Sequence, residues 1–232
     1  MCIDVTERMP GGNQIVSCSQ DRDLRIWRRD NGVFLKKYDL SSFTGENITS
    51  MRLGKDENML FLGSKDMNVY LIDISKGKLC VVYEGHWSNE QYLKYLDRVT
   101  QIYTIPDKDV LVTVSESNVK VWDLEYDECI KNMNEHNSQI VFIAQTSAEQ
   151  VMTIGQSFEF KTWNYVTGAI TDSQELGLDK DARQLKNLSI ICCDVLEDLA
   201  FVALSTNEVS VYSIRENRVL HSFLSYNGKL HN

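Results

Sequence analysis

The feature that most constrains this chain is a short segment that recurs five times. Each copy has a polar residue, an apolar one, a variable one, a mostly apolar one, a bulky apolar residue and usually a polar one. The copies are Asp23–Arg28, Asn68–Asp73, Asn118–Asp123, Glu159–Asn164 and Glu208–Ser213. Their bulky residues, Trp27, Ile72, Trp122, Trp163 and Tyr212, are 45, 50, 41 and 49 residues apart. This period indicates an array of small units, none of which can bury its apolar faces alone.

Short apolar runs and turn residues complete each unit. Five residues after the bulky position stands a turn former: Gly32, Gly77, Gly168, Asn217 and, in the third copy, the pair Asp127–Glu128. Two apolar runs of strand length precede each copy, and one follows it. The runs directly before the copies are 14–19, 59–64, 110–114, 150–154 and 199–204. Those before them are 3–6, 48–53, 99–105, 140–144 and 188–195, and those after the copies are 33–38, 79–83, 129–133, 169–171 and 219–223. Four antiparallel strands per period are typical of a β-propeller blade.

In this pattern the chain resembles the WD-repeat (WD40) family. The residues that carry the resemblance are 19–27, which end in Ile26-Trp27, and Val119-Lys120-Val121-Trp122-Asp123. Gly85-His86 and Glu135-His136 stand where the family places a Gly-His pair. The turn aspartate of the family is matched by Asp21 and Asp66 and approximated by Glu116, whereas Ser157 and Thr206 depart from it. The resemblance covers nearly the whole chain and identifies no subfamily.

The resemblance implies a structural role for the signature residues. In the family the Trp packs between blades within a buried hydrogen-bond network. The network expected here comprises Asp21, Trp27, Asp66, His86, Glu116, Trp122, Asp123, His136 and Trp163. We expect Trp122 to be buried, and we group His136 with Glu116 and Trp122 in the third blade. Buried donors of this kind are normally satisfied, so we interpret these histidines as structural.

We therefore predict an all-β, WD-type propeller with about five four-stranded blades. A single domain is expected over residues 1–224, with blades at 1–40, 46–83, 98–133, 138–172 and 187–224 and a polar tail at 225–232. The WD family resemblance implies seven blades as the commonest number, and no spare strand is visible to close a ring. A closed five-bladed ring, a ring completed by a partner and a fragment of a longer chain all remain open, and we favour the last two.

Composition narrows the classes of function. The chain has 232 residues and a net charge of −9, which argues against a nucleic-acid or anionic-membrane binder. The longest apolar stretch, 199–204, is too short to span a bilayer, and no signal peptide is visible. The six cysteines form no CxxC pair, so we expect reduced residues mostly in the core. These features indicate a cytoplasmic protein, with a nuclear location also open.

A search for catalytic and metal-binding motifs finds none. The signatures of nucleotide-binding loops, zinc proteases, α/β-hydrolases and protein kinases are absent from the sequence. We therefore expect no enzyme, no cofactor, no metal site and no small-molecule substrate. An alternative is a propeller glycosidase or sugar-binding protein, for which only Asp4 and Asp194 fall in or beside the strands that would line a central channel. A weaker alternative is an RNA-associated WD subunit that uses the basic run Arg22, Arg25, Arg28, Arg29, Lys36 and Lys37.

Two long connections indicate where partners bind. They span residues 84–98 and 173–187, and each joins the fourth strand of one blade to the first strand of the next. Ser88 and Gln91 have the spacing of a helix capping box in the first connection. Exposed aromatic residues are enriched at protein interfaces, so the partner-binding residues we expect are Trp87, Tyr92, Lys94, Tyr95 and Arg98. The alternatives are a lid that packs on the third blade and, for 173–187, a solvated connector. We predict a scaffold subunit of a multiprotein complex that binds other proteins through one propeller face.

Overall fold

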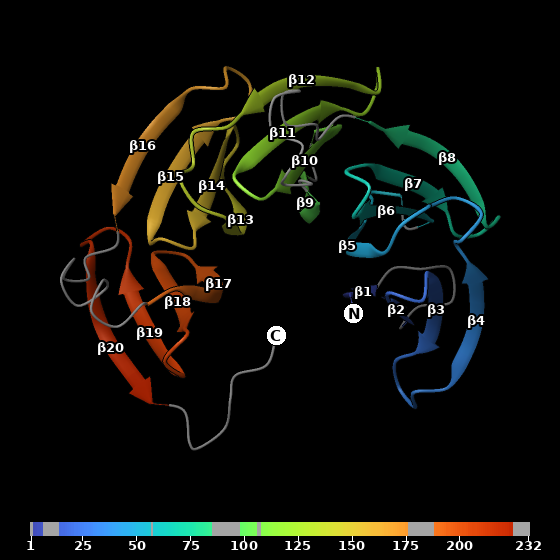
Figure 1. The fold of residues 1–232 in the computed structure, drawn as a ribbon, viewed down its shortest axis with the longest axis horizontal. Helices are drawn as coiled ribbons and strands as arrows, with labels where there is room; N and C mark the ends of the chain where they lie inside the picture. The colour runs from blue at the N-terminus through green and yellow to red at the C-terminus, as the bar shows by residue number, and fades with distance from the viewer. Residues whose placement is uncertain are drawn as a thin grey trace. The chain divides into compact units, whose positions relative to one another are not determined.

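The computed structural model describes residues 2–6, 14–56, 58–84, 98–105, 108–175 and 188–224. These residues form five four-stranded antiparallel sheets, and within each sheet the strands lie in the order of the chain (Figure 1). The prediction of an all-β chain built from five four-stranded blades is thereby confirmed. The chain divides into two compact units, Met1–Asn132 and Met133–Asn232. The single domain expected over residues 1–224 stays a prediction.

The first unit contains three sheets. The first has β1 (Cys2–Thr6), β2 (Gln14–Cys18), β3 (Asp23–Arg28) and β4 (Phe34–Asp39). The second has β5 (Ile48–Leu53), β6 (Met59–Ser64), β7 (Val69–Asp73) and β8 (Lys78–Tyr83). The third has β9 (Val99–Ile105), β10 (Val110–Ser115), β11 (Asn118–Asp123) and β12 (Glu128–Met133), which ends at the first residue of the second unit.

The second unit contains the other two sheets. One has β13 (Ile140–Ser147), β14 (Gln150–Gly155), β15 (Glu159–Asn164) and β16 (Ile170–Glu175). The other has β17 (Ile190–Leu196), β18 (Leu199–Leu204), β19 (Glu208–Ser213) and β20 (Arg218–Leu224). The strand β16 extends to Glu175, beyond the boundary expected at residue 172, through pairing of Glu159 with Glu175. Most of its side chains are exposed, so a polar sequence does not oppose this backbone pairing.

Each sheet buries an apolar face against a neighbouring sheet in the same unit. In the first unit, Val16 and Leu24 pack with Leu62 and Tyr70 of the second sheet. The opposite face of that second sheet packs on the third sheet, where Trp122 is only 3% exposed. In the second unit, Ile154 and Phe160 pack with residues of β17–β20, among them Val202 and Tyr212. The expected burial of Trp122 is confirmed.

The turn after each repeated segment has a left-handed residue at the position that the sequence marks. Gly32, Gly77 and Gly168 have φ of 65°, 64° and 80°, and Asp127 and Asn217 have φ of 55° and 47°. Glycine tolerates this region because it has no Cβ, and Asn and Asp tolerate it better than other residues. The five turn formers therefore have a common backbone role.

The cysteines correct one expectation. Cys18 is buried and Cys193 is half-buried. By contrast, Cys80, Cys129 and Cys192 are exposed. Cys80 and Cys129 lie in β8 and β12, the last strands of their sheets, where alternate side chains point to solvent.

A glycine pair tests the turn geometry. Gly32→Ala should cost about 1 kcal/mol of unfolding free energy, because an L residue is strained at positive φ and nothing lies within 4 Å of the added Cβ. Gly77→Ala has similar strain but places its Cβ 2.7 Å from the Tyr38 ring, so it should cost about 1–2 kcal/mol more. Urea unfolding of both variants measures the difference, and equal losses would contradict the packing of Tyr38 on this turn.

Candidate functional site

Three tryptophans make the same hydrogen bond to a hydroxyl on the neighbouring strand. Trp122 Nε1 donates to Thr113 Oγ1 at 2.8 Å, and Trp163 Nε1 donates to Thr153 Oγ1 at 2.7 Å. Trp27 Nε1 donates to Ser17 Oγ at 2.8 Å. The hydroxyl residue pairs with the residue two positions before the Trp, so both side chains lie on one sheet face. A buried indole N–H thereby keeps a partner without water.

His136 extends this contact in the second unit. Its Nε2 lies 2.6 Å from Thr153 Oγ1, the atom that accepts the Trp163 hydrogen bond. Its Nδ1 lies 3.3 Å from a carboxylate oxygen of Glu159. Lys161 Nζ lies 3.1 Å from the other oxygen of Glu159. A hydroxyl that accepts from the indole can donate to Nε2, so the neutral tautomer with its proton on Nδ1, toward Glu159, fits these contacts.

This placement corrects the grouping of His136 with Glu116 and Trp122. His136 follows β12 in the connection to β13, and its partner Thr153 lies in β14. The connection thus delivers the histidine to the sheet that follows it. Glu116 instead has a left-handed backbone, with φ of 42°, in the tight turn between β10 and β11.

Burial governs the protonation of His136. Its side chain is fully buried, and burial lowers its pKa to about 4 although the Glu159 carboxylate favours the charged form. Burial also opposes the charge on Glu159, but hydrogen bonds from Lys161 and the Asn137 amide outweigh it and lower the pKa of that carboxyl. The neutral imidazole is thus the folded form near pH 7, which fits a structural donor and acceptor.

The aspartates of the signature cap turns. Asp66 accepts a hydrogen bond from the Asn68 amide at 3.2 Å and another from the Tyr70 hydroxyl at 2.6 Å. Asp123 accepts from the Glu125 and Tyr126 amides at 2.8 and 3.2 Å. Side chains that satisfy turn amides in this way stabilise the local backbone.

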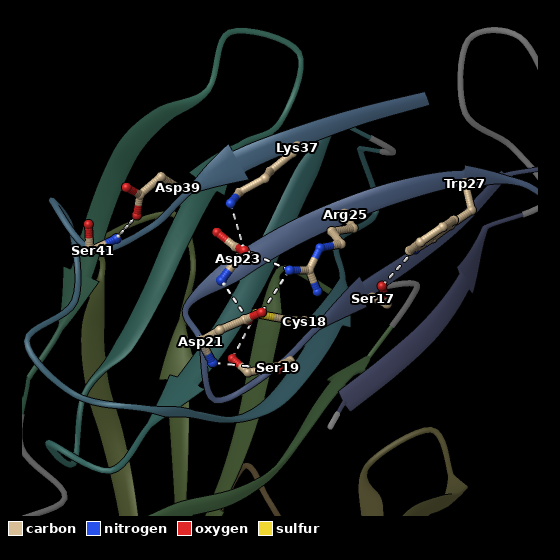
Figure 2. A network of polar contacts seen from close by, with 10 residues as sticks. All are labelled: Ser17, Cys18, Ser19, Asp21, Asp23, Arg25, Trp27, Lys37, Asp39 and Ser41. Atoms are coloured by element: carbon tan, nitrogen blue, oxygen red, sulfur yellow. Dashed lines mark hydrogen bonds and ion pairs between the residues drawn. The ribbon is translucent and has the colours of Figure 1, made fainter. Parts of the chain in front are cut away.

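The basic run of the first sheet is partly neutralised (Figure 2). Arg25 lies 2.7 Å from both Asp21 and Asp23, and Lys37 lies 2.7 Å from Asp23. Arg22 donates instead to the backbone oxygens of residues 44 and 45. Arg25 and Lys37 are therefore paired with carboxylates, which weakens the case for a phosphate-binding surface.

The expected partner-binding residues lie almost wholly outside the described residues. Trp87, Tyr92, Lys94 and Tyr95 fall there, as does His86, and Arg98 is described and exposed. In the second connection, residues 173–175 belong to β16, and 176–187 also fall outside the described ranges.

The two carboxylates considered for a central channel lie in different sheets. Asp4 belongs to β1, and Asp194, in β17, is exposed and accepts a hydrogen bond from the adjacent Val195 amide at 2.8 Å. No group of three or more His, Cys, Asp or Glu residues within the described ranges could hold a metal ion. Within the described ranges, no helix is long and apolar enough to cross a membrane.

The comparisons with known proteins agree with this arrangement. The family model "WD domain, G-beta repeat" matches residues 2–28. A solved structure of the RRP9 WD40 repeats superposes with a TM-score of 0.74 over 96% of this chain. Residues 2–28 thus match a WD repeat, and the chain has the fold of WD40 β-propellers. The tryptophan–hydroxyl contacts thus belong to a WD40 β-propeller fold, as the resemblance implied.

The similar proteins differ in what their names describe. Pre-mRNA-splicing factor cwf17 of Schizosaccharomyces pombe is 23% identical over 155 residues, or 67% of this chain. Apoptotic protease-activating factor 1 of Danio rerio is 22% identical over 229 residues, or 82% of this chain. A solved structure of U3-55K has a TM-score of 0.74, 16% identity and 96% coverage of this chain, and the RRP9 match is also 16% identical.

The chain spans only part of each of these proteins. It covers 43% of the splicing factor and 17% of the apoptotic factor. It covers 62% and 63% of the RRP9 and U3-55K chains. At 16% identity, the two solved structures support the fold alone.

The shared hydroxyl of Thr153 gives a stability test. Thr153→Val removes the acceptor of Trp163 and the partner of His136 while keeping the side-chain shape. We expect a loss of about 2–4 kcal/mol, because two buried polar groups are left unsatisfied. Ser17→Ala is the control and should cost about 1 kcal/mol, because Trp27 is partly exposed and water can replace the hydroxyl. Equal losses in denaturant unfolding would contradict this role for Thr153.

The lowered pKa of His136 predicts a pH dependence. The unfolded imidazole takes up a proton near pH 6.5 and the folded one only near pH 4. The unfolded state therefore binds more protons in this window, and the fold loses stability as the pH falls through it. Between pH 7 and 4 the wild type should lose about 2–3 kcal/mol more than His136→Gln. Parallel pH profiles in urea unfolding would show that His136 does not titrate in this way.

Proposed function

We propose that this WD40 chain is a non-catalytic scaffold that binds partner proteins as a subunit of a larger complex. The observation that carries the proposal is the structural use of its reactive side chains. His136 and Thr153 hold Trp163, and Asp66 and Asp123 cap turns. A rigid frame of this kind leaves specificity to the connections between strands.

The names of the similar proteins support an assembly role without fixing a process. One relative is named as a splicing factor and another as a protease-activating factor. We propose an intracellular location, cytoplasmic or nuclear, because these names describe intracellular processes. Partner proteins are the proposed ligands, and the proposal includes no cofactor and no small-molecule substrate.

The connection 84–98 is the proposed contact for partners. It is rich in aromatic residues at Trp87, Tyr92 and Tyr95, and it carries Lys94 and Arg98 beside three acidic residues. Aromatic and arginine side chains dominate binding energy at protein interfaces. This mixture therefore fits a partner surface with apolar pockets.

An RNA-associated role is the second candidate, favoured by the splicing-factor name of one relative. The pairing of Arg25 and Lys37 with Asp21 and Asp23 counts against a binding surface on the first sheet. Titration with single-stranded RNA at two salt concentrations separates the candidates. Binding that weakens steeply with salt would favour the RNA role.

Replacing Trp87, Tyr92 and Tyr95 together by Ala tests the partner contact. Recovery of co-purifying proteins with the tagged full chain should fall at least about tenfold, because large aromatic contacts are lost. The thermal unfolding midpoint should stay nearly unchanged. Tyr126→Ala is the matched control, because Tyr126 is 68% exposed in another turn, and it should leave recovery intact. If the midpoint falls by several degrees while recovery survives, these aromatics pack within the fold and the proposed contact is wrong.

A further inference from the structure

The turn between the second and third strands carries the same carboxylate contact in the first two sheets. In β1–β4, one oxygen of Asp21 accepts a hydrogen bond from the amide two residues later at 3.1 Å, and the other lies 2.7 Å from Arg25 (Figure 2). In β5–β8, Asp66 binds the amide two residues later at 3.2 Å and the Tyr70 hydroxyl at 2.6 Å. One oxygen therefore caps the turn, and the other binds the side chain two residues before the bulky residue.

The last two sheets carry their carboxylate two residues further along the chain. A hydroxyl residue stands at the turn position and a glutamate follows two residues later: Ser157 and Glu159 in β13–β16, and Thr206 and Glu208 in β17–β20. Glu159 Oε1 lies 3.1 Å from Lys161 Nζ, and Glu208 Oε1 accepts from the Ser210 hydroxyl at 3.4 Å. Lys161 and Ser210 again precede the bulky residue by two. The carboxylate has thus moved while keeping one of its two partners.

In β13–β16 this move changes what the second oxygen of the carboxylate reaches. Glu159 Oε2 accepts a hydrogen bond from the Asn137 amide at 3.2 Å and lies 3.3 Å from His136 Nδ1. Asn137 and His136 both lie in the connection 134–139, between the end of β12 and the start of β13. A carboxylate accepts more strongly than a neutral oxygen. Glu159 therefore binds the third strand of its own sheet and the connection that leads into that sheet.

Two neighbouring residues bring the same connection close to the sheet. Ser138 Oγ accepts from the Ser157 amide at 3.1 Å and lies 2.8 Å from Ser157 Oγ. The residue that replaces the turn carboxylate thus contacts the connection as well. A Cβ at Gly155 would lie 2.7 Å from Ser138 Oγ and 3.1 Å from His136 Nδ1. The missing side chain of Gly155 therefore leaves the space that this close approach requires.

We propose that Glu159 is the positioning residue of the connection 134–139, a role that the shift of the carboxylate from position 157 to position 159 makes possible. Lys161 holds one oxygen of Glu159, and the other oxygen fixes the connection and orients His136. The imidazole then keeps its proton on Nδ1 and presents Nε2 to the Thr153 hydroxyl. This role is independent of the partner contact at residues 84–98, so its failure would leave the proposed function untouched.

Glu159→Ala in the full chain tests the role through two local readouts. Hydrogen exchange of the Asn137 amide, followed by NMR, should quicken at least about tenfold, because a hydrogen bond to a charged group is lost. The ring nitrogen shifts of His136 should show the proton moving from Nδ1 to Nε2. Thr153 can accept that proton, because its own hydroxyl can donate to the Lys161 carbonyl, 3.4 Å away. Amides of β18 and β19 should quicken much less than that of Asn137.

Glu208→Ala is the matched control, because it removes the carboxylate from the same position of β17–β20. Within the described residues Glu208 binds Ser210 of its own strand, so Asn137 exchange and the His136 tautomer should stay at their wild-type values. Glu159→Gln keeps the shape and an acceptor oxygen without the charge. It should quicken Asn137 exchange by a smaller factor, and it supplies the measurement if Glu159→Ala does not fold.

Three results would overturn the proposal. The first is wild-type exchange of Asn137 in every folded variant of Glu159. The second is a quickening that is equal at Asn137 and in β18 and β19, which would reveal a loss of global stability alone. The third is an effect of Glu208→Ala on Asn137 and His136 as large as that of the Glu159 variants.

Discussion

Each four-stranded sheet of this chain has two faces, and a sheet alone can bury neither of them. The sheet β5–β8 shows the consequence most fully, because its two faces lie in two cores: Leu62 and Tyr70 on one side, and Phe61 and Tyr83 on the other. Because sheets in such an array support one another, the stability of each depends on its neighbours. Each sequence repeat thus supplies both four strands and the apolar faces that pack on neighbouring sheets.

The tryptophan–hydroxyl contact makes these interfaces specific. A bulky apolar side chain alone would fill the space between sheets, as Ile72 and Tyr212 do in their copies. A Trp adds an indole N–H that must find an acceptor when buried, and Thr113 and Thr153 supply one from the adjacent strand. His136, in the connection after β12, also contacts the Thr153 hydroxyl. The histidine and threonine side chains, which could suggest catalytic chemistry, therefore stabilise the packing of the tryptophans.

The sequence predicted the elements well because their signals are local. Alternating apolar runs set the strands, and the left-handed turn positions are marked by Gly, Asn or Asp five residues after each bulky residue. Contacts between sheets were harder to predict from the sequence. The position of His136 next to the third copy suggested Trp122, but its connection carries it to Thr153 of the following sheet.

Hydrogen–deuterium exchange of the full chain, followed by mass spectrometry at low protein concentration, tests most directly whether covered sheet faces hold the structure together. Amides that open only with the loss of two packed faces exchange most slowly. The account predicts that the inner strands β6 and β7, whose sheet is buried on both faces, are protected longer than β18 and β19, whose sheet has one exposed apolar face. Equal protection of the two pairs of strands, or faster exchange in β6 and β7, would contradict it.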